Sequence, residues 1–200
     1  MAESIVQVTE GTGKKLHTFQ RTVGANSVED EAVYPAEFPS ASYSLIASNI
    51  STATSASHIL QIMAGATNYV RIRRIYVQQT GLAGAVNTFV LQFFRLITAG
   101  TGGTAVTARP YDISDAAAGA TGMTRPTTKG TEGVQLGLLR VPLFAAYPVT
   151  SPPAVWEQHP GMKPLIIPPG TTNGIALKIA TGVASSTIDV VVELVETSFL

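Results

Sequence analysis

The stretch "FVLQFFRLI", which begins at Phe89, constrains the fold more than any other part of this sequence. Side chains alternate between the two faces of a β-strand, so Phe89, Leu91 and Phe93 would share one face and Val90 and Phe94 the other. A strand in a soluble monomer normally keeps one face polar. This strand is apolar on both, and its second face therefore needs a partner to pack against.

Exposing the apolar side chains of this second face to water would cost a large free energy for a single strand. Leaving a large apolar side chain in water forgoes roughly 1.5–3 kcal/mol, so three forgo roughly 5–9 kcal/mol, which compares with a net domain stability of about 5–15 kcal/mol. We therefore expect the second face to lie between subunits, most simply in a homotrimer. Cover by the chain's own N-terminal arm is the alternative. The expected interface residues are Phe89, Leu91, Phe93, Phe94 and Arg95, with Arg95 pairing with an acid of a neighbour; which face lies between subunits stays open.

From Tyr43 onward the sequence predicts an all-β fold, because short apolar alternations are separated by clusters of Gly, Pro, Ser and Thr. An antiparallel β-sandwich, closed as a jelly roll, is the expected architecture of residues 41–200. The phase of the alternation slips near Arg73–Arg74, which predicts a β-bulge. The expected strands are Tyr43–Ile50, His58–Met63, Tyr69–Gln78, Asn87–Thr98, Thr104–Ala108, Val134–Leu143, Ala154–Gln158, Leu165–Ile167, Gly174–Ala180 and Thr187–Glu196.

Residues 1–40 differ in composition and are expected to form an extended N-terminal arm. An acidic cluster, Glu29 to Glu31, is followed by two prolines, which is typical of a linker or arm. The arm is either a frayed terminus or a segment that becomes ordered on a partner. In the second case Phe19, Tyr34 and Phe38 are the expected contacts.

Composition excludes several classes of function. Thirteen basic and thirteen acidic residues give a net charge of zero, and the basic residues are scattered, so we expect no nucleic-acid partner. The absence of cysteine excludes disulfides and thiolate chemistry. No apolar run approaches the roughly 18 residues that span a bilayer, so we expect no membrane partner and synthesis in a cytoplasm.

No arrangement of residues predicts an enzyme, a cofactor or a metal site. The three histidines, His17, His58 and His159, lie far apart without metal-site spacing. No G-x-S-x-G elbow is present. The carboxylates at the end of the chain, Asp189, Glu193 and Glu196, are interpreted as the solvated part of a strand rather than as an acid/base pair.

Residues 99–133 form a long connection rich in Ala, Gly and Thr, and such a connection is usually functional or bound to something. Small residues in it permit close approach of the backbone to a neighbour. Trp156, the lone tryptophan, is expected to anchor the core or an edge, or to meet a partner or sugar. Tyr111 and Tyr147 are weaker candidates of the same kind.

The segments "VRIRRIYVQQTG", "TKGTEG" and "PPGTTNGIALK…DVVVELVE" resemble those of a group of tailed-bacteriophage structural proteins, and the resemblance covers about residues 69–196. It implies a virion component. Small jelly-roll trimers of this kind serve as decoration, or cement, proteins on the major capsid protein.

The resemblance thus implies a trimer on the capsid exterior that contacts the major capsid protein and neighbouring decoration trimers. Tyr111 and Trp156 are further candidate contacts there. The alternatives are a receptor- or glycan-binding appendage, with Trp156, Tyr111 and Tyr147 on one rim, and a neck or tail connector.

Overall fold

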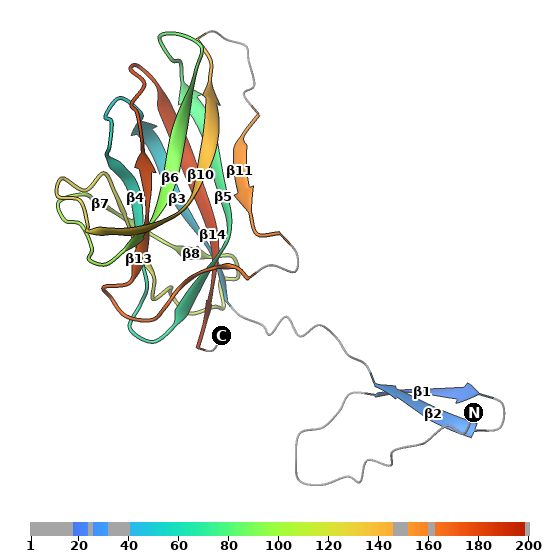
Figure 1. Ribbon diagram of the computed structural model, residues 1–200. Coiled ribbons are helices and arrows are strands. Elements are labelled where there is room, and N and C mark those ends of the chain that lie inside the picture. The colour runs from blue at the N-terminus through green and yellow to red at the C-terminus, as the bar shows by residue number, and fades with distance from the viewer. Residues whose placement is uncertain (1–17, 24–25, 32–40, 146–151, 160–162, 199–200) are drawn as a thin grey trace. The chain divides into compact units, whose positions relative to one another are not determined.

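A computed structural model describes residues 18–23, 26–31, 41–145, 152–159 and 163–198 (Figure 1). The chain divides into two compact units, Met1–Pro39 and Ser40–Leu200. In the first unit β1 (Thr18–Val23) pairs antiparallel with β2 (Asn26–Glu31). The acidic run expected to be linker thus lies in a strand, with Glu29 opposite Gln20.

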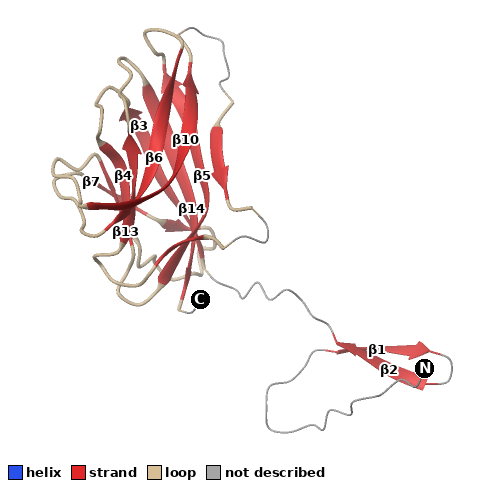
Figure 2. Cartoon of the chain, in the orientation of Figure 1, coloured by secondary structure: helices blue, strands red, loops and turns tan. Residues whose placement is uncertain are grey.

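The second unit is a sandwich of two antiparallel β-sheets, and its described residues contain no helix (Figure 2). One sheet has the order β10-β6-β13-β4-β9-β7. Its strands are β4 (His58–Met63), β6 (Asn87–Leu96), β7 (Thr104–Thr107), β9 (Thr121–Thr124), β10 (Glu132–Leu143) and β13 (Gly174–Ile179).

The other sheet has the order β11-β5-β14-β3-β8, and β12 also pairs with β5. Its strands are β3 (Ser42–Ser51), β5 (Tyr69–Gly81), β8 (Arg109–Pro110), β11 (Ala154–Glu157), β12 (Leu165–Ile167) and β14 (Thr187–Thr197). From β3 to β6 successive strands alternate between the two sheets, and the late strands β13 and β14 are each inserted between earlier ones.

The core lies between the sheets because each contributes one face of alternating apolar side chains. On β14, Ile188, Val190, Val192 and Leu194 are at most 1% exposed, and the residues between them are partly exposed. On β6, Phe89 faces the same interior. Burying large aliphatic side chains in this way stabilises the fold by roughly 1.5–3 kcal/mol for each.

All ten expected strands are present, and the antiparallel β-sandwich is confirmed. The bulge is confirmed too, since Glu193 pairs with Arg74 and Leu194 with Ile72, which leaves Arg73 as the extra residue.

The expected long connection of residues 99–133 is largely ordered within the sandwich. Besides the expected β7, it supplies β8 at the edge of one sheet and β9 between β4 and β7. At Gly130 the backbone comes especially close to a neighbour, because a Cβ there would lie 2.2 Å from the carbonyl oxygen of Thr98. The small residues therefore permit close approach within the chain.

Candidate functional site

The face of β6 that points away from the core is the first candidate site. Phe89, Leu91 and Phe93 are at most 1% exposed in the sandwich interior. Val90 and Phe94, on the opposite side of the strand, are half-buried. Each face of the strand therefore has a distinct environment: the outward one carries Val90 and Phe94 on either side of Gln92, and its Leu96 is buried against Met63 and Ala176.

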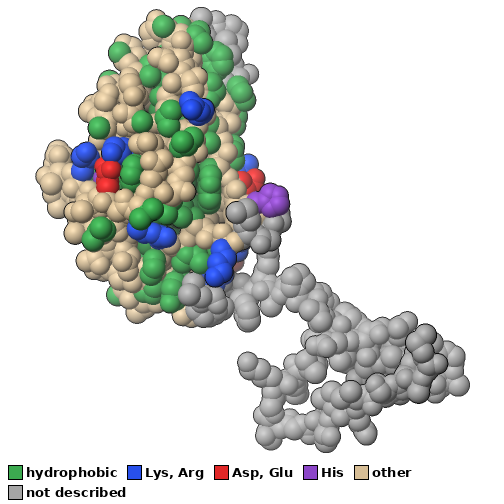
Figure 3. Space-filling view, viewed as in Figure 1, with side chains coloured by type: hydrophobic (Ala, Val, Ile, Leu, Met, Phe, Trp, Pro, Cys, Tyr) green, Lys and Arg blue, Asp and Glu red, His purple; other side chains and the backbone are tan. Residues whose placement is uncertain are grey.

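The neighbouring edge strand, β10, extends this apolar surface. Val134 is 72% exposed, Leu136 38% and Leu138 48%. Leu138 lies opposite Gln92 of β6 in the register. Figure 3 shows hydrophobic side chains interspersed with other side chains over this side of the molecule. We call the side chains Val90, Phe94 and Leu138 the outer β6/β10 face; the register places Gln92 and Gln135 on the same side, with their amide nitrogen and oxygen 3.4 Å apart.

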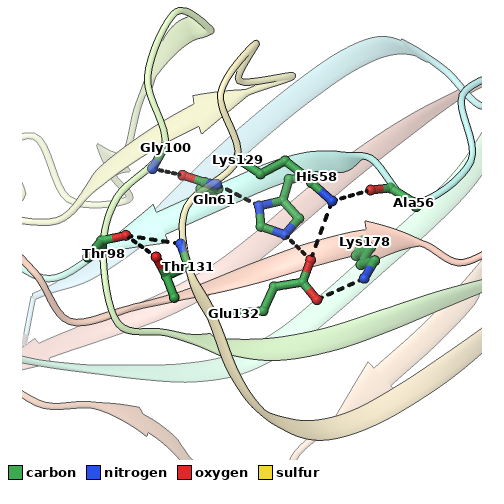
Figure 4. Close-up of polar contacts among 9 residues, drawn as sticks. All are labelled: Ala56, His58, Gln61, Thr98, Gly100, Lys129, Thr131, Glu132 and Lys178. Carbon is green, nitrogen blue, oxygen red and sulfur yellow. Dashed lines mark hydrogen bonds and ion pairs between the residues drawn. The ribbon is translucent and has the colours of Figure 1, made fainter.

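A polar cluster lies beside this face, on the same side of the sheet (Figure 4). The His58 ring, whose side chain is 0% exposed, places Nε2 2.9 Å from Oε1 of Glu132. The second carboxylate oxygen of Glu132 accepts a hydrogen bond of 2.8 Å from Nζ of Lys178. Lys178 also lies 4.8 Å from the centroid of the Phe94 ring, a cation–π distance that joins the cluster to the outer β6/β10 face.

The hydrogen bonds fix the tautomer of His58. The backbone N–H of Gly100 donates to Oε1 of Gln61 over 2.8 Å, so the amide nitrogen of Gln61 points at Nδ1 of His58, 2.7 Å away. That nitrogen is a donor, and Nδ1 must accept. The proton is therefore on Nε2, which donates to Glu132, and His58 is neutral.

Burial acts on the two titrating groups in different ways. Desolvation lowers the pKa of His58 below its ordinary value and outweighs the opposing effect of Glu132. Desolvation opposes ionisation of Glu132, but the hydrogen bonds from Lys178 and His58 prevail and hold the pKa of that carboxyl below its ordinary value. The stable state is thus neutral imidazole beside an ionised carboxylate.

The cluster fastens two loops to the sheet. Gln61 holds the loop after β6 through Gly100, and Lys129 donates from the loop before β10 to the carbonyl oxygen of Ala56 over 3.0 Å. The hydroxyl of Thr98 donates to Thr131 between the same loops. Each group of the cluster is engaged within the chain, which favours a structural role over acid/base catalysis.

Glu196 also has a structural role, and its interpretation as part of a solvated strand is wrong. It is 7% exposed, and its carboxylate accepts hydrogen bonds from the backbone N–H groups of Gly119 and Ala120 at 3.0 and 2.6 Å. Asp189 accepts from the N–H of Asn49 over 2.8 Å. Glu196 thus holds the loop before β9 in place, and Asp189 bonds the backbone within β3.

The structure corrects the predicted intersubunit interface at three of its five residues. Phe89, Leu91 and Phe93 are buried in the chain's own core, so a neighbouring subunit cannot contact them. Phe94 remains available, because it belongs to the outward face. The guanidinium of Arg95 donates to the carbonyl oxygen of Ile166, an intrachain contact in place of the expected acid of a neighbour, and burial lowers its pKa.

The aromatic residues expected to share one rim do not lie together. Trp156 is on β11, half-buried, with its ring 6.2 Å from that of Phe93 in an edge-to-face arrangement. Tyr111 follows β8, at the opposite edge of the same sheet, and is 62% exposed. Trp156 therefore anchors an edge. The side chain of Phe19, and residues Tyr34, Phe38 and Tyr147, lie outside the described residues.

Two searches of the described part of the chain gave negative results. No group of three or more His, Cys, Asp or Glu side chains there is placed to hold a metal ion. Within the same residues, no helix has the length and apolarity needed to cross a membrane.

Comparison of the chain with known proteins gave no match to a family model, a curated protein or a solved structure.

The His58 cluster predicts that acid destabilises the protein. The pKa of His58 is lower in the folded than in the unfolded chain, so below about pH 6.5 the unfolded chain binds the proton more readily and stability falls with pH. Below the ordinary pKa of Glu132 the stability falls further, because the pKa of this carboxyl is also lower in the folded than in the unfolded chain. Urea unfolding at pH 7.5, 6.5 and 5.5 should show this fall in the unmodified protein.

His58→Gln should flatten the pH dependence between pH 7.5 and 5.5. It should also lower the free energy of unfolding at pH 7.5 by about 1–3 kcal/mol, because buried hydrogen-bonding groups lose their partner. His159→Gln, at an exposed histidine, is the matched control and should keep the original slope. An unchanged slope in His58→Gln would contradict the assignment.

Proposed function

We propose that this chain is a non-enzymatic capsid decoration, or cement, protein of a tailed bacteriophage. It forms a homotrimer that binds the outside of the head and stabilises the shell of the major capsid protein. The observation that carries the proposal is the outer β6/β10 face, where Val90, Phe94 and the exposed Leu138 lie on the outward side of an edge strand and its neighbour.

The edge position of β10 supports an interface on its sheet. The outward side of the β5 sheet mixes charges and apolar groups: Arg74 lies opposite Glu193 of β14 and Glu157 of β11, and Val191 lies between Ile46 and Tyr76. On the outer β6/β10 face Leu138 is exposed on an edge strand. Proteins usually protect such an edge, because it invites association with another chain.

A second copy of the chain is the proposed cover. Sandwiches that pack sheet against sheet around an axis form closed rings, and closure leaves no apolar face exposed. The strand orders β3-β14-β5-β11 and β4-β13-β6-β10 support the proposed jelly roll, since from β3 to β6 successive strands alternate between the sheets. This agrees with the fold that the sequence resemblance implies.

Cementing would be mechanical rather than chemical. A trimer seated over a junction of capsid subunits contacts several of them at once, and its individually weak contacts act together through effective concentration. The His58 cluster supports a non-enzymatic role, because its groups are engaged in holding loops to the sheet. The N-terminal unit and the ordered loops of residues 99–133 are the proposed contacts with the capsid and with neighbouring trimers.

The copy number in the virion tests the role. Quantitative mass spectrometry of purified virions should find this protein in numbers comparable to the major capsid protein, as expected for a subunit that covers the head. A few copies per particle would instead indicate a neck or tail connector, and would contradict decoration.

A charge placed on the outer β6/β10 face should break the trimer. Leu138→Lys puts an ammonium group where the interface would exclude water, and burying an unpaired charge is costly. Light scattering should give a trimer of the 20.9 kDa chain for the unmodified protein and a monomer for the variant.

Ile46→Lys is the matched control. Ile46 is 54% exposed on β3, in the other sheet, and its substitution should leave the trimer intact. If the unmodified protein is a stable monomer, or if both variants keep the same mass, the proposed interface is wrong.

A further inference from the structure

The hydrogen bonds from Gly100 to Glu132 all run in one direction through the polar cluster (Figure 4). The backbone N–H of Gly100 donates to Oε1 of Gln61 over 2.8 Å, and the amide nitrogen of Gln61 donates to Nδ1 of His58 over 2.7 Å. Nε2 of His58 then donates to Glu132 over 2.9 Å. Gln61 is 1% exposed and Gly100 is buried, so each group depends on the partner that the chain gives it.

A proton added to Nδ1 of His58 is incompatible with this direction. Nδ1 then becomes a donor and faces the amide nitrogen of Gln61, which is a donor too. Gln61 can rotate its amide group and turn its oxygen toward Nδ1, but its nitrogen then faces the backbone N–H of Gly100. A backbone N–H only donates. Gln61 therefore cannot satisfy both neighbours once His58 is charged.

The contact with the charged ring is the stronger of the two. A hydrogen bond from an ionised donor is roughly twice as strong as one between neutral groups. The bond between Gly100 and Gln61 joins two neutral groups. Gly100 is thus the partner that Gln61 loses.

A cavity beside these groups gives room for the change. It has a volume of about 380 Å³, and both Gln61 and Gly100 line it, together with the polar residues Thr121 and Thr171. A cavity of this size admits water, which can bond to the N–H that Gln61 releases. The released backbone therefore does not leave a buried donor without a partner.

Burial and three charged groups decide when His58 takes up the proton. Burial has the largest effect and lowers the pKa of His58, whereas Glu132 raises it by accepting from the ring. Lys129, in the loop before β10, and Lys178, on β13, lower it further. The ring therefore becomes charged only below its ordinary pKa.

The other elements around His58 add little to this balance. Strand β9, which pairs with β4, has no titratable side chain. Arg95 of β6 donates to a carbonyl oxygen of β12, and Arg125, the other cation of the loop before β10, is exposed. The titration of His58 thus depends on burial, Glu132 and the two lysines.

We propose that protonation of His58 turns the amide of Gln61 and releases the backbone at Gly100 from the sheet, as an acid-operated switch. The change is local, because Thr101 and Thr128 keep their mutual backbone bonds of 2.9 and 3.1 Å, in which His58 takes no part. It is an opening of one loop rather than unfolding of the chain. The switch acts within one chain and does not depend on the proposed trimer.

Amide hydrogen exchange, read by NMR on the unmodified protein, tests the switch at Gly100. Its protection factor should be level above about pH 6.5 and fall by up to about tenfold per pH unit below it, the slope for one proton taken up on opening. Val192, in the centre of β14, reports global unfolding. Low urea should speed exchange at Val192 but not at Gly100, because a local opening exposes little surface.

Gln61→Glu separates this switch from a general effect of acid. Its carboxylate has two acceptor oxygens and no donor, so it accepts from Gly100 and from protonated Nδ1 together. The protection of Gly100 should then stay level from pH 7.5 to 5.5, and the ring of His58, followed by its nitrogen chemical shifts, should titrate at a higher pH. Gln78→Glu, the same change at an exposed position of β5, is the matched control and should keep the original fall.

His58→Gln provides a second variant, because it removes the titrating ring itself. Gly100 should lose its pH dependence in this variant, whatever its protection at pH 7.5. Three results would overturn the proposal: constant protection of Gly100 in the unmodified protein, exchange at Gly100 that follows Val192 in both pH and urea, or an undiminished fall in either Gln61→Glu or His58→Gln.

Discussion

Phe93 packs where the two sheets meet, with its ring against the edge strand of the opposite sheet through Trp156. Phe89 and Leu91 fill the interior along the same side of β6. Because β6 is hydrogen-bonded to β10 on one side and to β13 on the other, it cannot rotate without losing both ladders. A slip of one residue would send all three side chains outward. No small rotation or slip of β6 can therefore bury its outward side, which carries Phe94.

The same constraint explains the position of the polar cluster. The outward side of β4 and β13 carries His58 and Lys178, and Glu132 at the start of β10 joins them. The hydrogen bonds of the cluster hold the neighbouring loops against the sheet, so the polar part of this surface is satisfied within the chain. The apolar part of this surface, on β6 and β10, stays partly exposed in the single chain. An unsatisfied apolar surface beside a satisfied polar one favours assembly over catalysis.

The sequence predicted the strands well because period-two alternation is a local signal. The bulge at Arg73 was predicted for the same reason, since the phase of the alternation changes there. Strands β8 and β9 were missed: they are short and lie in a run of Gly, Ala and Thr, and their partners β3 and β4 come from an earlier part of the chain. Their pairing is set by the tertiary fold, which a local pattern does not contain.

The candidate site was less predictable than the fold. Apolar residues on both sides of β6 indicated a surface needing cover, but only the packed structure shows that the Phe93 side is internal. The contact between His58 and Glu132 joins residues 74 positions apart, and no spacing pattern in the sequence predicts it. Glu196 was misread because alternation alone does not show that its carboxylate meets the amides of Gly119 and Ala120.

The proposed trimer requires another copy of the chain to cover the outer β6/β10 face. Hydroxyl-radical footprinting of the unmodified protein, read by mass spectrometry, tests this cover directly at Leu138 and Ile46. In the single chain these side chains have similar exposures, 48% and 54%, on opposite sheets. If a second copy covers the face, Leu138 is protected while Ile46 is oxidised at the rate its exposure implies. Equal oxidation of the two side chains would contradict the proposed interface.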